Sequence, residues 1–394
     1  MAARYFINGG VNSNWSTSGN WSATDGGAAS GVKPASTDDV FFTANSPNCT
    51  ADTAGVGLTL NFTGYASTIT MNAGLTISGS VTLVSAMTIA GTSGLTVSAT
   101  ATLTSNGKVW PNALTLNGAV THTLADNWDV DGLLTFGATS TTTVINGFQI
   151  TASAGVTCSS AAGSTSGTTN IILDGTGTFQ GSSNTAQLRN NVTINTAGTI
   201  TIGTNLVYNT STFTYTAGTV VTTSSTLTTA SSTTFACNGI TWDNVALSGV
   251  TVTMTFNENL NLTGLLSIAT SNQNMTLTGN TINAAGGVRY GGTTGTISGT
   301  TVINVNGTGT LDGPSASTGG INNPITINAP GGTVTIAATF RILLNQLLYT
   351  AGTVTTSVGT WGAGGGAATP SRKMRLFEGF KIKLISGRLI IQQR

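Results

Sequence analysis

The chain has 394 residues, a formal net charge of +1 and only 6% charged residues, whereas charged residues make up about 25% of a typical soluble domain. Nucleic-acid binding needs a basic surface, so this balance excludes nucleic acid as an expected partner of the chain's main body. No run of about 18 apolar residues occurs, and we therefore expect no membrane insertion.

The first 57 residues differ from the rest and form a predicted N-terminal cap or head region. They carry Trp15 and Trp21 in "SNWSTSGNWS", a turn at Pro34 and a short strand from Val40. A stacked fold needs its open end covered, and large aromatic side chains bury much area. We favour a Trp-rich cap over the alternative, in which the two indoles form a platform that stacks against sugars.

Residues 58–361 form the predicted body, which reads as short strands separated by turns. Segments such as "LTLNF", "LTIS", "VTLV" and "LTVS" alternate an apolar residue with Thr or Ser, which is the period of a half-buried strand. Gly and Asn separate these segments, and helical periodicity is absent. The fold class is therefore predicted to be all-β.

A block of the body recurs after 132 residues. The segment from Trp110 to Asn191 returns from Trp242 to Asn323 without a gap, so that "GLLTF" becomes "GLLSI" and "GTGTF" becomes "GTGTL". A third, partial copy repeats "YTAGTV" of Tyr215 at Tyr349. Antiparallel sandwiches give the same local alternation, but a long repeat favours a parallel β-solenoid (β-helix) with about twenty residues in each coil. Inward Leu, Ile, Val and Phe would then form one core, and Thr columns would face outward.

One acidic cluster, "DNWDVD", combines Asp126, Asp129 and Asp131 with Trp128. Paired carboxylates near an aromatic residue are what glycoside hydrolysis uses. The repeat has other residues at these four positions, so the fold does not require the cluster: Glu258, Leu260, Asn261 and Thr263. We keep these residues, with the two N-terminal indoles, as glycan-binding candidates, and solvated turn carboxylates are the alternative.

Other chemistry finds little support in the sequence. The single histidine, His122, has no nucleophile motif beside it, and the three distant cysteines provide neither metal-site spacing nor a disulfide framework. We predict no catalytic residue, no metal site and no cofactor.

The C-terminal part changes in composition. Residues 362–371 form a predicted Gly-rich linker, and residues 372–394 hold seven of the 13 basic residues. In "FKIKLISGRLII", apolar and basic residues alternate around Ser386 and Gly387, which predicts a β-hairpin. This segment either closes the solenoid or docks on an acidic partner surface. For the second case the virion-anchor candidates are Arg372, Lys373, Arg375, Lys381, Lys383 and Arg388.

The opening "NGGVNSNWSTSGNWS", the following "KPASTDDVFF" and the Thr- and Gly-rich strands resemble a class of phage-encoded proteins from environmental genomes. More broadly they resemble β-solenoid tail spikes, tail fibres and autotransporter passengers. The N-terminus has no apolar stretch of signal-peptide length, and no translocator barrel is evident, which argues against an autotransporter. The resemblance therefore implies a virion protein assembled in the host cytoplasm, and it transfers no catalytic residue.

From these features we expect a structural, non-enzymatic protein of the bacteriophage surface. It would be a tail fibre, tail spike or capsid decoration that contacts host-surface polysaccharide and other virion proteins. The resemblance implies a homo-oligomer, with a trimer favoured. Two alternatives remain: a spike that degrades polysaccharide through Asp126, Asp129 or Asp131, and a secreted adhesin or surface-layer protein.

Overall fold

The structure is a computed structural model. The residues that it describes are 1–10, 12–137, 142–158, 164–181, 188–209, 212–229, 231–236, 239–249, 251–269, 274–291, 295–313, 320–337, 340, 347–356, 380–385 and 388–393. They form two compact units, Met1–Val207 with Thr216–Val221 (unit 1), and Tyr208–Tyr215 with Thr222–Arg394 (unit 2).

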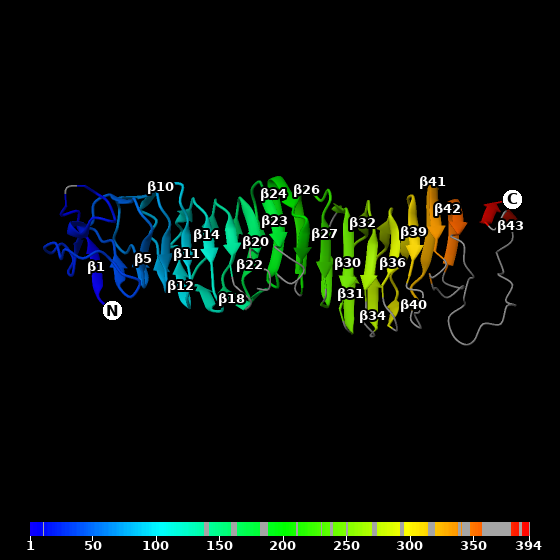
Figure 1. The fold of residues 1–394 in the computed structure, drawn as a ribbon, viewed down its shortest axis with the longest axis horizontal. Coiled ribbons are helices and arrows are strands. Elements are labelled where there is room, and N and C mark those ends of the chain that lie inside the picture. The colour runs from blue at the N-terminus through cyan, green and yellow to red at the C-terminus, as the bar shows by residue number, and fades with distance from the viewer. Residues whose placement is uncertain are drawn as a thin grey trace. The chain divides into compact units, whose positions relative to one another are not determined.

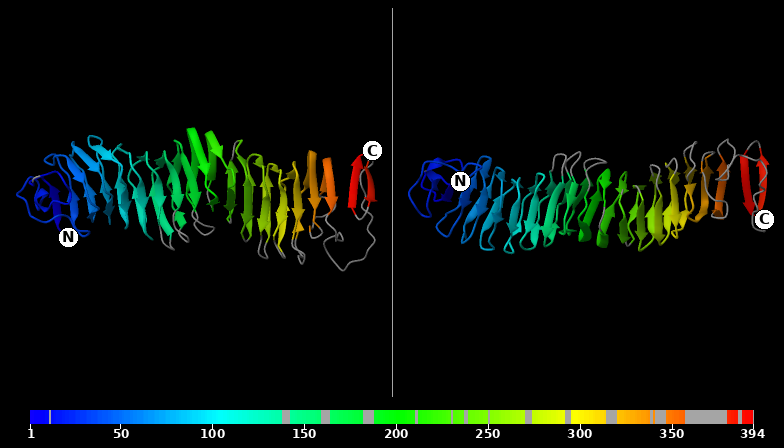
Figure 2. Two further views of the ribbon diagram at one scale, coloured as in Figure 1. Left: turned by 45° about the horizontal axis from the view of Figure 1, so that its top comes forward. Right: turned by 90° about the horizontal axis from the view of Figure 1, so that it is seen from below.

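Unit 1 is a stack of coils that each contain about three short strands (Figures 1 and 2). One sheet contains β1 (Ala3–Phe6), β2 (Trp21–Ser22), β3 (Asp39–Phe41), β6 (Thr59–Asn61), β9 (Val81–Thr82), β12 (Ala101–Thr104), β15 (Thr121–Leu124), β18 (Thr142–Gly147) and β21 (Ser164–Ser166). A second column contains β4 (Cys49–Ala51), β7 (Thr68–Met71), β10 (Thr88–Gly91), β13 (Val109–Trp110), β16 (Trp128–Val130), β19 (Ile150–Ala152) and β22 (Asn170–Leu173).

The third column of unit 1 contains β5 (Gly55–Gly57), β8 (Leu75–Ile77), β11 (Leu95–Val97), β14 (Leu114–Leu116), β17 (Leu134–Phe136), β20 (Gly155–Cys158) and β23 (Gly177–Gly181). The long strand β24 (Asn191–Ile202) pairs with both β22 and β23, and β25 (Asn205–Val207) follows it. Strand β26 (Thr212–Val221) has residues in both units.

Apolar residues of unit 1 stack in register from coil to coil. In the third column one buried residue pairs with the next in parallel: Leu75, Leu95, Leu114, Leu134, Val156 and Phe179, each at most 1% exposed. Each such side chain contributes about 1.5–3 kcal/mol by leaving water. The predicted parallel β-solenoid is thus confirmed. Its coils vary from the predicted twenty residues, because Leu95 and Leu114 are 19 residues apart and Val156 and Phe179 are 23 apart.

The parallel stack begins inside the predicted cap. Strand β3 pairs in parallel with β6, and β5 with β8, so the boundary predicted at residue 57 does not coincide with a break in stacking. Ahead of these strands, aromatic rings pack at the first coils. The rings of Trp15 and Trp21 lie 4.8 Å apart at 70°, and those of Phe42 and Phe62 are stacked 4.9 Å apart.

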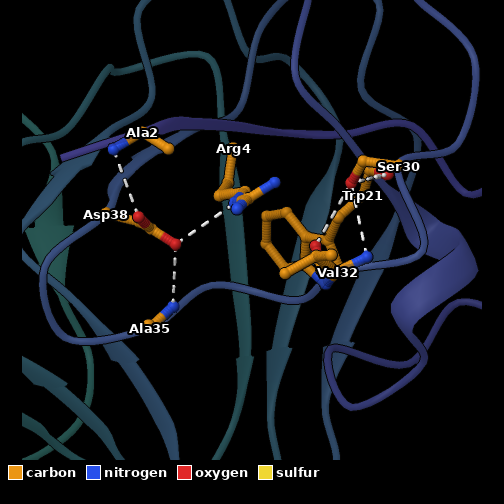
Figure 3. A network of polar contacts seen from close by, with 7 residues as sticks. All are labelled: Ala2, Arg4, Trp21, Ser30, Val32, Ala35 and Asp38. Atoms are coloured by element: carbon orange, nitrogen blue, oxygen red, sulfur yellow. Dashed lines mark hydrogen bonds and ion pairs between the residues drawn. The ribbon is translucent and has the colours of Figure 1, made fainter.

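Polar contacts hold the N-terminal segment in place (Figure 3). Asp38 accepts hydrogen bonds from the Arg4 Nε (3.1 Å) and from the backbone N–H groups of Ala2 (3.2 Å) and Ala35 (3.1 Å). Burial raises the pKa of Asp38, but these three donors outweigh it and hold the pKa below its usual value. Ser30 adds a hydrogen bond from its hydroxyl to the carbonyl oxygen of Trp21 (3.0 Å).

Unit 2 repeats the arrangement with parallel pairing (Figure 1). One column contains β28 (Thr233–Ala236), β31 (Val252–Phe256), β34 (Met275–Gly279), β37 (Thr296–Gly299) and β40 (Gly320–Ile321). The second contains β29 (Thr241–Trp242), β32 (Leu260–Leu262), β35 (Ile282–Ala284) and β38 (Ile303–Val305). The third contains β27 (Thr226–Thr229), β30 (Asn244–Ser248), β33 (Leu266–Ala269), β36 (Gly287–Tyr290) and β39 (Gly309–Asp312). Strand β41 (Ile325–Ile336) pairs with β38, β39 and β42 (Leu347–Thr356).

The sequence repeat is a repeat of structure. Trp110 and Trp242 are both buried and end equivalent strands, β13 and β29. Gly155 and Gly287 also match: their φ angles are +97° and +98°, and a Cβ would approach the carbonyl oxygens of Thr178 and Thr310 to 2.1 and 2.2 Å. Only glycine fits there without strain, which explains why the sequence keeps it in both copies.

Unit 2 also contains a column of amide side chains. Asn261, Asn283 and Asn304 occupy the outward positions of β32, β35 and β38, and each pairs with the next in register. The Nδ2 of Asn283 donates to the Oδ1 of Asn261 (2.7 Å), and the Nδ2 of Asn304 donates to the Oδ1 of Asn283 (2.9 Å). Such amide ladders add side-chain hydrogen bonds to the backbone bonds between stacked strands.

The predicted C-terminal hairpin is confirmed in its backbone. Strands β43 (Phe380–Ile385) and β44 (Arg388–Gln393) pair antiparallel, with Ile382 opposite Ile391, and β44 lies beside β42. This placement is the one expected of a strand pair that closes the stack. The predicted linker, 362–371, and the turn at Ser386 and Gly387 lie outside the described residues.

Candidate functional site

The three tryptophans chosen as glycan-binding candidates are buried. Trp15 is 2% exposed, and Trp21 and Trp128 are 0% exposed. A ring stacks on a sugar only if one face is accessible, so the expectation of an indole platform is wrong for all three. Trp15 and Trp21 instead pack among the aromatic rings of the first coils, and Trp128 takes an inward position of β16. The rule that large aromatic side chains are usually core holds for each of them.

Asp126 has a structural partner set. Its carboxylate accepts hydrogen bonds from the backbone N–H of Ser105 (2.7 Å) and of Asn106 (2.6 Å), one coil earlier. Asn106 has a φ of +49°, in the left-handed region that L-residues rarely adopt. Asp126 therefore supports a tight turn, and its two oxygens are already engaged there.

Asp129 and Asp131 remain accessible, and a third carboxylate joins them. Asp129 is half-buried on β16, whereas Asp131 and Asp174 are exposed. Ser153, on the intervening coil, donates its hydroxyl to Asp174 (2.8 Å). Burial first, then the charges of Asp131 and Asp174, raises the pKa of Asp129. Carboxylates from two coils thus gather on the face of unit 1 that β16, β19 and β22 form.

Phe148 lies on the same face and was not predicted from the sequence. Its side chain is 54% exposed. It precedes Ile150 by two residues, as Asp126 precedes Trp128, and Ile150 pairs with Trp128, so Phe148 follows Asp126 by one coil. The signal that would have identified it is an aromatic residue outside the strand alternation, directly after Gly147 in a turn.

The ring and the carboxylates are separated along the strand direction. Thr151 pairs with Asp129, and Phe148 precedes Thr151 by three residues, which span at most about 11 Å. A sugar chain laid along the strands is long enough to stack on the ring and to donate its hydroxyl protons to the carboxylate oxygens.

We name Phe148, Asp129, Asp131 and Asp174 the acidic face. The second copy keeps the core at this place and loses all four side chains: the equivalent residues are Asn280, Asn261, Thr263 and Asn306. Leu134 and Leu266, which begin the next strand in the two copies, are both 0% exposed. The fold therefore tolerates the acidic face without needing it.

Replacing Asp129 with Asn, the residue of the second copy, is expected to leave the fold intact. Its raised pKa means that ionised Asp129 is disfavoured in the folded state, so the variant should be slightly more stable at pH 7, by less than about 0.5 kcal/mol as for surface changes. The difference should vanish at a pH low enough to protonate Asp129. Urea unfolding of both proteins at pH 7 and pH 3 measures this, and a loss of stability at pH 7 would contradict it.

The other predicted site residues are only partly described. Lys381 and Lys383 lie on β43 and Arg388 begins β44, whereas Arg372, Lys373 and Arg375 lie outside the described residues. Among the described residues, no group of three or more His, Cys, Asp or Glu side chains is placed to hold a metal ion. No membrane-spanning helix is found in that part of the chain.

Comparison with protein-family models, with curated protein sequences and with solved structures finds no match to this chain.

Proposed function

We propose that the chain is a structural protein of a bacteriophage surface: a tail fibre, tail spike or capsid decoration whose solenoid presents the acidic face to host-surface polysaccharide. The observation that carries the proposal is the difference between the two copies. Both keep the same buried residues and glycines, but only the first carries an exposed phenyl ring on one face with three carboxylates. A parallel β-solenoid is compatible with tail-spike-like proteins, and the resemblance of the opening segment adds the phage context.

Assembly on the particle belongs to the same proposal. The basic hairpin around Lys381, Lys383 and Arg388 would contact other virion proteins, and a homotrimer is the favoured assembly. The virion is the proposed location, after assembly in the host cytoplasm. The backbone of β43 and β44 next to β42 supports a strand pair at the end of unit 2.

Two measurements test this function together. Antibodies raised against the protein should label purified virions of the phage that encodes it, seen by electron microscopy. Immobilised host capsule or lipopolysaccharide should bind the purified protein, and the variant Phe148→Asn with Asp131→Thr should lose that binding. The matched control is Asn280→Ala with Thr263→Ala at the same place in the second copy, which should bind as the unchanged protein does. Unlabelled virions, or equal binding by the Phe148→Asn, Asp131→Thr variant, would refute the proposal.

A second candidate function is cleavage of the bound polysaccharide. The observation that favours it is the raised pKa of Asp129 near two further carboxylates, since glycoside hydrolysis pairs a protonated with an ionised carboxyl group. Incubation with host polysaccharide should then shorten its chains, and Asp129→Asn should abolish the shortening. Chains of unchanged length after prolonged incubation rule this candidate out.

A further inference from the structure

Unit 2 displays hydroxyl side chains in two neighbouring columns on the face formed by β28, β31, β34 and β37. Thr234 pairs with Thr255 and Thr255 with Thr278 in one column, and Thr253 pairs with Thr276 and Thr276 with Ser298 in the other. All six side chains are exposed or half-buried. We name these six residues the hydroxyl array.

The array has two regular spacings. Parallel strands lie about 4.7–4.9 Å apart, and outward residues two apart on one strand are separated by about 6.6 Å. The residues between them face inward: Met254 and Leu277 are both 0% exposed. The Oγ1 atoms of Thr255 and Thr278 lie 3.3 Å apart. β-Branched threonine has few rotamers, so the backbone fixes a two-dimensional lattice of hydroxyl and methyl groups.

The fold does not require this lattice. In the first copy Thr253 and Thr255 have the equivalents Thr121 and Thr123, but the next coil carries Val144 and Asn146 in place of Thr276 and Thr278. The inward residue between them is conserved in character, because Ile145 and Leu277 are both 0% exposed. The second copy has therefore completed the array at positions where the first copy folds equally well without it.

The chemistry of the array narrows its ligand. Strands β28, β31, β34 and β37 contain no charged residue, and their aromatic residues, Phe235 and Phe256, are buried. A single sugar chain would find neither a stacking ring nor a carboxylate here. A flat lattice of hydroxyls that donate and accept, with methyl groups between them, instead matches a ligand that is itself periodic in two directions and made of donors and acceptors. Both spacings lie near the oxygen repeats on the prism faces of hexagonal ice.

We infer that the hydroxyl array binds the surface of ice. The hydroxyls hydrogen-bond to water molecules at lattice positions, and the γ-methyl groups fill the spaces between them. Because the backbone and the rotamers are already fixed, binding orders the water without ordering the protein, which is the advantage of a preorganised surface. The inference is independent of the proposed attachment function.

The two copies provide the variants that test this inference. The purified full chain should show thermal hysteresis and should inhibit ice recrystallisation. Thr276→Val with Thr278→Asn, which imports the first-copy residues, should lose most of both effects. The converse change, Val144→Thr with Asn146→Thr, should extend a second array around Thr121 and Thr123 and increase them. Thr135→Ser, on another face of unit 1, is the control and should leave both effects unchanged.

Circular dichroism and thermal melting establish that each variant is folded, and a fluorescently labelled chain should be incorporated into a growing ice crystal. Absence of thermal hysteresis and of incorporation by the unchanged protein overturns the inference. Equal activity of the Thr276→Val, Thr278→Asn variant overturns it as well. Binding to crystalline cellulose or chitin that these two changes abolish, without any effect on ice, would show that the array serves a polysaccharide surface and would also overturn it.

Discussion

Replacing His122 with Met is expected to stabilise unit 1 and to remove much of its sensitivity to mild acid. His122 is 0% exposed, and neither ring nitrogen makes a hydrogen bond with a described residue. Burial lowers its pKa to about 4, and the Asn117 backbone opposes this only in part. The unfolded chain binds a proton near pH 6.5, and the folded chain only near pH 4. Stability should therefore be constant above about pH 6.5 and fall by about 3 kcal/mol as the pH decreases to 4.

Methionine is the matched replacement because Met254 occupies the same position in the second copy and is also 0% exposed. The variant should be more stable at pH 7 as well, by about 1–3 kcal/mol, since it no longer buries unpaired nitrogens. Urea unfolding at pH 7, 6, 5 and 4, followed by hydrogen exchange of β15, measures both effects. Asp38 does not mask them, since its pKa is held below its usual value, 3.8. An unchanged pH dependence in the variant would show that His122 is not the group responsible.

Removing the indole of Trp21 is expected to unfold the first coils of unit 1 while leaving unit 2 intact. Trp21 is 0% exposed, packs against Phe6 and Trp15, and donates its Nε1–H to the carbonyl oxygen of Trp15 (2.9 Å). A buried Trp replaced by Ala costs about 3–5 kcal/mol. In a stack each coil contacts only its neighbours, so the loss should remain near the N-terminus. Hydrogen exchange should accelerate in β1–β6 and stay unchanged in β31–β37.

Trp21→Phe provides the control, because it keeps a ring in the cluster and loses only part of the area and the hydrogen bond. Its effect on exchange should be clearly smaller than that of Trp21→Ala. If Trp21→Ala accelerates exchange equally along both units, unfolding is global and the Trp15–Trp21 cluster is not a local cap. If neither variant changes exchange, the rings do not stabilise the end of the stack.

The sequence was sufficient to predict the architecture because two signals agreed. Alternation such as "LTIS" and "LTVS" specifies strands with one buried face, and the 132-residue recurrence specifies stacking of like on like, which Leu95 and Leu114 show in register. Coil length was less predictable, because it depends on how many residues each turn inserts. The place where the two units divide, near Val207 and Thr222, has no compositional mark either.

The site was harder to predict because side-chain type does not fix side-chain direction. Trp128 directly precedes Asp129 on β16, yet strand alternation turns its ring inward and the carboxylate outward. Phe148 was overlooked for the opposite reason: a phenylalanine suggests core, but its turn position exposes it. Asp174 is 45 residues after Asp129 in sequence, so only the stacking of coils brings these carboxylates together.

The amide column gives unit 2 a polarity along its stacking direction. Both of its hydrogen bonds run from an Nδ2 to the N-terminal neighbour, so the amide dipoles of Asn261, Asn283 and Asn304 add head to tail. The last acceptor, the Oδ1 of Asn304, is buried and meets no donor among the described residues, and Thr326 follows it in register. One further Asn-bearing coil spliced in after β38 would supply the missing donor, so duplication of a whole coil is a route by which this column can lengthen.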